Sequence, residues 1–131
     1  MAMTITNADY VNIADEVMNS LKNRRLTTSQ IRKLLSMTAN IYNALKQKNT
    51  DEEDSDELSQ DILNQIQYLK LHVVYEAGRS TVKGDVYAFI EKAKLIDNID
   101  GIGNKKKNLI LFCHYMEALV AYHRFYGGRD Q

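Results

Sequence analysis

The stretch LTTSQIRKLLSMTANIYNAL, residues 26–45, combines a helix start signal with a long run of helical periodicity. Thr27 and Gln30 form a capping-box pair, in which each side chain can satisfy a backbone N–H group that the first turn leaves free. Leu26 and Ile31 occupy the two positions of a hydrophobic staple across that cap. Apolar side chains then recur every three or four residues as far as Leu45. The stretch therefore predicts an amphipathic helix that begins after Thr27.

The rest of the chain continues this helical pattern. There is no proline, and all six glycines fall where the periodicity breaks. Apolar periodicity predicts further helices over about residues 7–22, 56–77, 85–96 and 104–126. We expect an all-α fold, a compact five-helix bundle that forms a single domain over residues 1–131, with an acidic connector at about residues 48–56. The third and fifth helices should form its centre.

The third predicted helix carries two apolar stripes. One contains Ile62, Ile66, Leu69 and Val73, and the other contains Leu71, Val74 and Tyr75. An apolar surface this broad predicts a helix that is packed on two sides. Gly78 is expected to end the helix as a left-handed cap, and the last acidic residues of the connector should favour its positively polarised start.

Composition favours a soluble, cytoplasmic protein. The chain has 131 residues, of which 44% are hydrophobic and 26% charged, as in ordinary globular domains. Its apolar runs are too short to span a bilayer, so no membrane partner is expected. The N-terminal residues lack the basic and apolar stretches of a secretory signal, and the single cysteine, Cys113, cannot form an internal disulfide.

The charges are balanced in number but unevenly distributed. The chain has 17 basic and 17 acidic residues, and six of the acids lie in the run DEEDSDE at residues 51–57. The remainder carries 17 bases against 11 acids, a balance of +6. Such a body is compatible with an anionic partner, although many neutral proteins divide their charge in this way.

No pattern predicts a catalytic residue, a metal site or a cofactor. Cys113 and the three histidines lack the short spacings of zinc ligands, and Cys113 and His114 would point about 100° apart on a helix. Cys113 also lies in an apolar helix, where a thiolate would be disfavoured. The acidic run lacks the ligand spacing and central glycine of a calcium loop, and no phosphate-binding glycine loop is present.

The segment IDGIGNKKK, residues 99–107, resembles the hairpin of helix-hairpin-helix DNA-binding proteins. In such a hairpin the glycines let backbone N–H groups approach a phosphate at a helix N-terminus. The segment departs from that pattern at Lys107, where the family usually has a small residue. The segment has two interpretations. It is either a phosphate-binding hairpin or a glycine-rich turn followed by solvated lysines. The first interpretation gives an alternative function for the chain, a free-standing DNA-binding protein that uses the turn from Gly101 to Lys107.

Basic residues cluster around the start of the second predicted helix. They are Lys22, Arg24, Arg25, Arg32 and Lys33. With the hydroxyls of Thr28 and Ser29 and the free N–H groups of a helix start, such side chains suit phosphate oxygens better than bases. Aromatic residues lie mostly at core-facing positions, so stacking on bases is expected to be secondary. A solvated basic face remains the alternative reading of the cluster.

Three blocks of sequence resemble the small subunit of type III-A CRISPR effector (Csm) complexes. The blocks are residues 26–35 (LTTSQIRKLL), residues 68–70 leading to 75–79 (YLK and YEAGR), and residues 115–128 (YMEALVAYHRFYGG). The resemblance covers nearly the whole chain and implies a helical, non-catalytic subunit. It implies as partners a backbone filament, a large catalytic subunit, stacked copies of the chain itself and the guide RNA–target RNA duplex.

The resemblance also implies which residues face RNA. By matching blocks these are Arg32, Lys33, Lys70, Arg79 and Arg124, and the basic cluster adds Arg25. Because pairing with the guide supplies sequence recognition, such a subunit needs only a sequence-blind electrostatic surface. A purely structural helical adaptor without nucleic-acid contact is a third possibility.

Overall fold

The computed structural model describes residues 3–24, 26–47, 56–79 and 84–127, and these residues form an all-helical fold. The helices are α1 (Tyr10–Ser20), α2 (Thr28–Gln47), α3 (Gln60–Arg79), α4 (Asp85–Ala93), α5 (Leu95–Ile102) and α6 (Lys106–Phe125). The all-α prediction is confirmed, but the described residues contain six helices and not the five expected. The predicted acidic connector lies outside the described residues except for Asp56.

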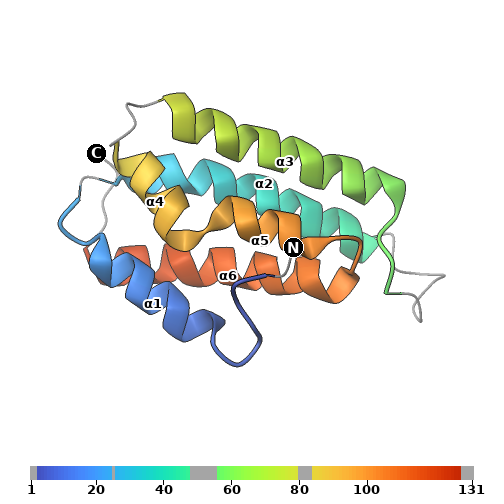
Figure 1. Cartoon of the computed structure of the whole chain (residues 1–131), viewed down its shortest axis with the longest axis horizontal. Helices are drawn as coiled ribbons and strands as arrows, with labels where there is room; N and C mark the ends of the chain where they lie inside the picture. The colour runs from blue at the N-terminus through green and yellow to red at the C-terminus, as the bar shows by residue number, and fades with distance from the viewer. Residues whose placement is uncertain (1–2, 25, 48–55, 80–83, 128–131) are drawn as a thin grey trace.

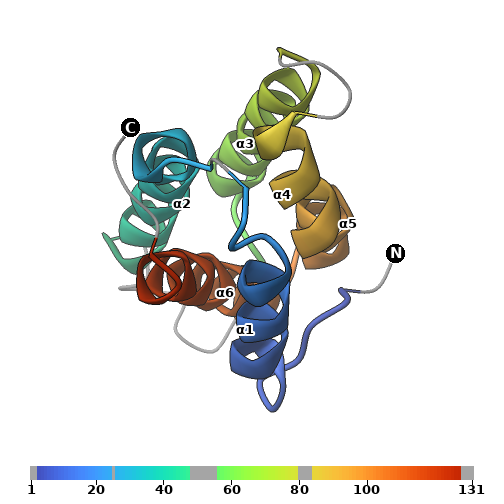
Figure 2. The ribbon, with the colours of Figure 1, turned by 90° about the vertical axis from the view of Figure 1, so that its left-hand side faces the viewer.

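Helix α6 forms the centre of the bundle, as expected for the last predicted helix. It packs against α1, α2 and α5, and the end-on view shows it next to α1 and α2 (Figures 1 and 2). Its inward residues are almost completely buried: Leu109, Phe112, Tyr115, Met116 and Leu119. Burial of such large apolar side chains is the main source of folding free energy, so α6 organises the core.

Helix α3 lies at the edge of the bundle and not at its centre. It packs against α2, α4 and α5 through one apolar stripe, and Figure 2 shows it at the outer end of the fold. The predicted second stripe is exposed: Leu71, Val74 and Tyr75 retain 63%, 45% and 60% of their accessible surface. The prediction of two-sided packing is therefore wrong for the isolated chain. Gly78 is not a cap either, because the helix continues to Arg79.

The predicted helix over residues 85–96 is broken at Lys94. This residue adopts a left-handed conformation with φ of 53°, which ends α4 and begins α5. Side chains from other parts of the core stabilise the break. The hydroxyl of Tyr115 donates a 2.9 Å hydrogen bond to the carbonyl of Ala93, and the amide of Asn98 donates one of 3.0 Å to the carbonyl of Lys94. No glycine marks this position, which is why periodicity alone predicted one continuous helix.

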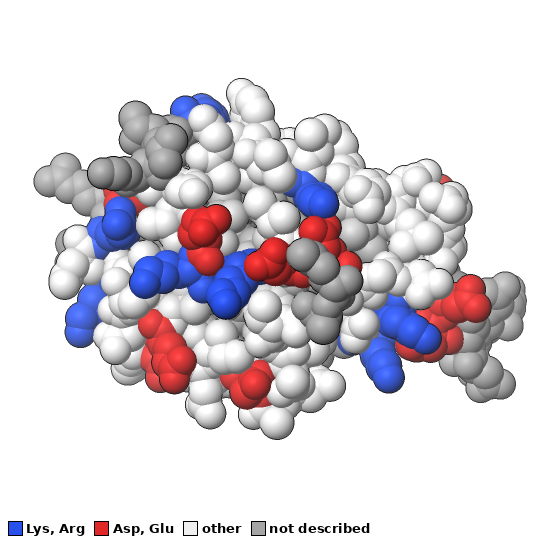
Figure 3. Space-filling model, viewed as in Figure 1, with Lys and Arg blue, Asp and Glu red and all other residues white. Residues whose placement is uncertain are grey.

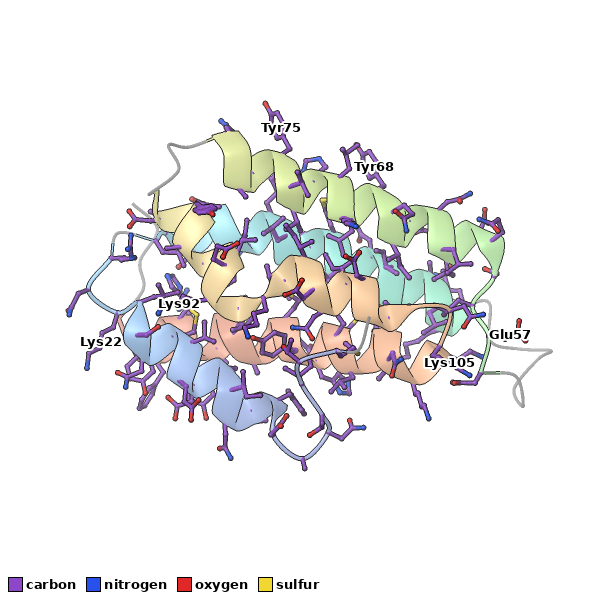
Figure 4. All side chains as sticks on the ribbon, viewed as in Figure 1. Lys22, Glu57, Tyr68, Tyr75, Lys92 and Lys105 are labelled. Atoms are coloured by element: carbon purple, nitrogen blue, oxygen red, sulfur yellow. The ribbon has the colours of Figure 1, made fainter. Side chains whose placement is uncertain are left out.

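The end of the acidic run caps α6 and not α3. The carbonyl and carboxylate of Asp56 accept hydrogen bonds from the backbone N–H groups of Lys106 (2.7 Å) and Lys107 (3.1 Å). Next to it, Glu57 forms an isolated antiparallel bridge with Lys105, and Figure 4 shows the two side chains at the same end of the molecule. Helix α3 begins only at Gln60, so the prediction that the acidic residues favour its start is wrong.

The start of α2 agrees with the sequence. The helix begins at Thr28, and both staple residues, Leu26 and Ile31, are buried. Nε2 of His123 donates a 2.6 Å hydrogen bond to the carbonyl of Leu26, which ties this start to the end of α6. The side chain of Gln30 lies outside the described residues, so the capping box itself stays a prediction.

Candidate nucleic-acid interface

Two predicted RNA-facing residues, Lys33 and Arg79, meet at one carboxylate. Helices α2 and α3 run antiparallel, so the start of α2 lies beside the end of α3. Nζ of Lys33 and Nη1 of Arg79 each lie 3.5 Å from Oε2 of Glu76. The side chains of Lys33 and Arg79 are 54% and 62% exposed, whereas that of Glu76 is only 13% exposed. One carboxylate therefore faces two cations, and the group presents a net positive charge to solvent.

Arg32 adjoins this group from the next position of α2. Its side chain is exposed and forms no ion pair with another residue of the described part of the chain. Successive residues of a helix point about 100° apart, so Arg32 faces further round α2 than Lys33 does. Lys33 and Arg79 thus share one carboxylate between α2 and α3, and Arg32 adds a third exposed cation on the neighbouring side of α2. We refer to these three residues as the cationic edge.

Lys70 belongs to a different surface. Its Nζ lies 2.7 Å from Oδ1 of Asp100 on α5, and the two side chains are about equally exposed. Lys70 and Glu76 are six residues apart on a helix, so their side chains point about 120° apart around α3. The structure does not bring Lys70 to the cationic edge, and Asp100 balances its charge locally.

Among the described residues, the other cations that the sequence singled out form no ion pair with Glu76. Arg124 is exposed in the last turn of α6, and Arg25 lies outside the described residues. Arg24, from the same sequence cluster, pairs with Asp85 at the start of α4 at 3.3 Å. Lysine and arginine side chains alternate with acidic ones on the face shown in Figure 3 and do not form one continuous patch there.

The hydroxyls expected at the start of α2 contribute unequally. Thr28 is completely buried, so its hydroxyl cannot reach a phosphate at the surface, and the prediction for this residue is wrong. Ser29 is exposed, with its Oγ 3.2 Å from Oγ1 of Thr27. Guanidinium and ammonium groups, and not the threonine hydroxyl, are thus the groups that this region offers to an anion.

The hairpin-like turn uses its phosphate-binding groups within the chain. The N–H groups of Lys106 and Lys107 already donate to Asp56. Gly101 has another reason to be glycine, because a Cβ there would lie 2.6 Å from the backbone nitrogen of Met3. Such a contact is too short for any side chain. The structure therefore weakens the hypothesis of a helix-hairpin-helix DNA-binding protein.

Aromatic side chains are more exposed than the sequence indicated. Tyr68 and Tyr75 retain 59% and 60% of their accessible surface, and Figure 4 shows both projecting from α3 away from the body of the protein. Their spacing of seven residues places them on one side of the helix. The expectation that aromatic residues mostly face the core fails for this helix. Periodicity identifies an apolar stripe but does not indicate whether another helix packs against that stripe or whether it stays exposed.

Comparison with known proteins agrees with the resemblance in the sequence. The model of the type III-A Csm2 family matches residues 5–129. The chain belongs to the Csm2 family. A Streptococcus thermophilus protein named CRISPR system Cms protein Csm2 is 39% identical over 131 residues, which cover 96% of this chain and 98% of that protein. A Mycobacterium tuberculosis (strain CDC 1551 / Oshkosh) protein of the same name is 33% identical over 132 residues, which cover 98% and 100% of the two chains.

A third relative, the Csm2 protein of Enterococcus italicus, is 39% identical over 107 residues, which cover 80% of this chain and 71% of that protein. As a Csm2 family member the chain is a small, non-catalytic subunit of the type III-A CRISPR (Csm) complex, and other Csm subunits are its partners. No helix in the described part of the chain combines the length and apolar character needed to cross a membrane.

The only cysteine of this Csm2 family member is chemically protected. Cys113 is buried in α6, and burial, together with the negative charge of Glu117, raises the pKa of its thiol from 9.0 to about 12. The reactive thiolate is therefore scarce at neutral pH. Among the residues that the structure describes, no three His, Cys, Asp or Glu side chains gather in a way that could hold a metal ion.

Proposed function

We propose that the chain acts in the cytoplasm as the small subunit that lines the inner channel of the type III-A effector in antiviral defence. There it contacts the sugar-phosphate backbone of target RNA paired with the guide RNA, and copies of the chain stack along the filament of backbone subunits beside the large catalytic subunit. Membership of the Csm2 family supports this proposal. The observation that carries it further is the convergence of Lys33 and Arg79 on the single carboxylate of Glu76.

The cationic edge suits a phosphate in both charge and geometry. Each cation keeps more than half of its side chain in solvent, so a phosphate can approach without breaking the contact with Glu76. Arginine can bind two phosphate oxygens at once, whereas lysine acts as a point charge. Contacts of this kind position the sugar-phosphate backbone of the RNA and do not distinguish one base sequence from another. They suit a subunit whose RNA is selected by base pairing with a guide.

The other candidates take smaller roles in this proposal. The 2.7 Å pair with Asp100 must loosen before Lys70 can bind a phosphate. Arg124 is exposed in the last turn of α6, next to His123, whose ring binds the carbonyl of Leu26 just before the start of α2. The apolar part of α3 that contains Leu71, Val74 and Tyr75 has the character of a surface that another subunit covers in the assembly.

The test uses the reconstituted complex and single alanine substitutions of Arg32, Lys33 and Arg79. Each should weaken target-RNA binding equally for all target sequences and lower the slope of log affinity against log salt by about 1 per lost phosphate contact. Lys92→Ala is the matched control, because Lys92 is exposed on α4 and outside the cationic edge. Affinity and slope that remain at the wild-type value in all three variants would instead indicate a structural adaptor.

A further inference from the structure

A groove runs between α2 and α3 beside the cationic edge. It has a volume of about 500 Å³ and is open to solvent. Its apolar part is formed by Met37 and Ile41, and its polar part by the side-chain amides of Asn40, Asn64 and Gln65. The ring of Tyr68 forms one wall. This size falls in the range of sites that bind small organic groups.

The amides of the groove can accept and donate hydrogen bonds. Asn40 and Gln65 form no side-chain hydrogen bond with any residue that the structure describes, and Asn64 uses only its oxygen, which accepts a 2.9 Å bond from Gln60. Because an amide group carries both a carbonyl oxygen and an NH₂ group, these side chains can complement many arrangements of donors and acceptors.

Much of the ring of Tyr68 is open to solvent. Its side chain is 59% exposed, and the ring of His72 contacts it edge to face, with centroids 5.5 Å apart and planes at 74°. That contact helps to hold the ring in place. A planar ring beside hydrogen-bonding amides is the combination that binds a nucleobase, which has a π face and a polar edge.

We propose that this groove holds one unpaired nucleobase of an RNA strand, stacked on Tyr68. The proposal rests on the proposed function, because the cationic edge would bind the neighbouring phosphate. Lys33 precedes Met37 by four residues, about 6 Å along the helix axis, on the same side of α2. That separation leaves room for the ribose between a phosphate at Lys33 and a base in the groove. The carboxylate of Asp61 at the far end disfavours a phosphate inside the groove itself.

The lining argues against an aliphatic side chain of a protein partner as the occupant. Such a group would remove the amides of Asn40 and Gln65 from water without giving them hydrogen-bond partners, which is unfavourable. A nucleobase supplies those partners along its edge. Since the amides can turn to present either group, the groove accepts different bases, which is compatible with a subunit that does not read sequence.

The test compares two single-stranded RNAs at low salt, oligouridine and an oligomer of the same length in which abasic sugars replace every base. Fluorescence anisotropy with the full chain measures the affinity for each. Wild-type protein should bind oligouridine roughly fivefold or more tightly than the abasic strand, as expected for stacking of one base. Tyr68→Ala should remove that preference, and Tyr68→Phe should retain it.

Tyr75→Ala is the matched control, because Tyr75 is equally exposed on the same helix but does not line the groove. It should keep the wild-type preference. If the wild-type chain binds both RNAs with equal affinity, and salt weakens that binding, the proposal of a base-binding groove is wrong. The proposal that the cationic edge binds phosphate would still stand. Absence of saturable binding to either RNA would overturn the groove proposal, whereas the cationic edge is judged by target-RNA affinity of the reconstituted complex. Loss of complex assembly in Tyr68→Ala with an unchanged preference for bases would show that Tyr68 serves a protein interface instead.

Discussion

Replacement of Glu76 by glutamine should strengthen binding of target RNA. The carboxylate contacts both Lys33 and Arg79 through one oxygen, at 3.5 Å in each case. Glu76→Gln keeps the length and shape of the side chain and removes its charge. The net charge of the group then rises from +1 to +2, and a bound phosphate no longer experiences repulsion from a buried anion.

The size of the effect follows from the geometry. A phosphate oxygen in contact with either cation lies roughly 6 Å from the carboxylate, given a charged contact of about 2.8 Å on the phosphate side. Two unit charges at that separation in water repel by about 0.7 kcal/mol, which corresponds to roughly threefold in affinity. The gain should shrink as salt is added, because ions screen exposed charges beyond about 10 Å at 0.1 M and more closely at higher salt.

Filter binding of target RNA to the reconstituted complex across a salt series measures this change. Glu91→Gln is the control, because Glu91 is exposed on α4 and away from the cationic edge, and it should leave the affinity near the wild-type value. The free energy of unfolding should fall by no more than about 1 kcal/mol, since ion pairs whose cations are largely exposed contribute little.

The sign of the change in RNA affinity distinguishes two possible roles of Lys33, Glu76 and Arg79: phosphate binding, or joining α2 to α3. If Lys33 and Arg79 bind phosphate, Glu76→Gln tightens RNA binding while Lys33→Ala weakens it. If the group serves only to join α2 to α3, both substitutions lower stability and neither changes RNA affinity. Weaker binding by Glu76→Gln, in a complex that assembles normally, would refute the electrostatic reasoning.

Two further predictions concern the core. Tyr115→Phe removes the hydrogen bond to Ala93 at the break between α4 and α5, and urea unfolding followed by circular dichroism should show a loss of about 1–1.5 kcal/mol; an unchanged midpoint would mean that Asn98 alone stabilises the break. Because the pKa of Cys113 is raised to about 12, its reaction with a disulfide reagent at pH 8 should be slow in the native protein and fast in denaturant. Rapid labelling of the native chain would contradict the burial of this thiol.

Much of the helix pattern could be predicted from local signals. The start of α2 after Thr27 and the apolar periodicity of α6 appear in the structure where the sequence placed them, because a 3.6-residue repeat and a cap involve only neighbouring residues. The break at Lys94 could not be predicted in this way. It depends on hydrogen bonds from Tyr115 and Asn98, and Tyr115 is distant in sequence.

The cations of the candidate interface were identified as residues but not as a group. The sequence placed Lys33, Lys70 and Arg79 together as RNA-facing candidates, yet the structure joins two of them through Glu76 and pairs the third with Asp100 on another side of α3. Glu76 lies in one of the matching blocks, but nothing else in the sequence indicated that its carboxylate would pair with these cations. The groove beside Tyr68 was also missed, because its lining comes from two helices.

The sequence by itself determined that this chain is helical, which stripes are apolar and which family it belongs to, because these properties depend on composition, on short spacings and on matching blocks. Only the tertiary structure decided which apolar stripe is buried, which carboxylate neutralises which cation and where the groove lies. Those outcomes depend on contacts between helices that are far apart in the chain, and the position of one helix relative to another is not encoded in the periodicity of either.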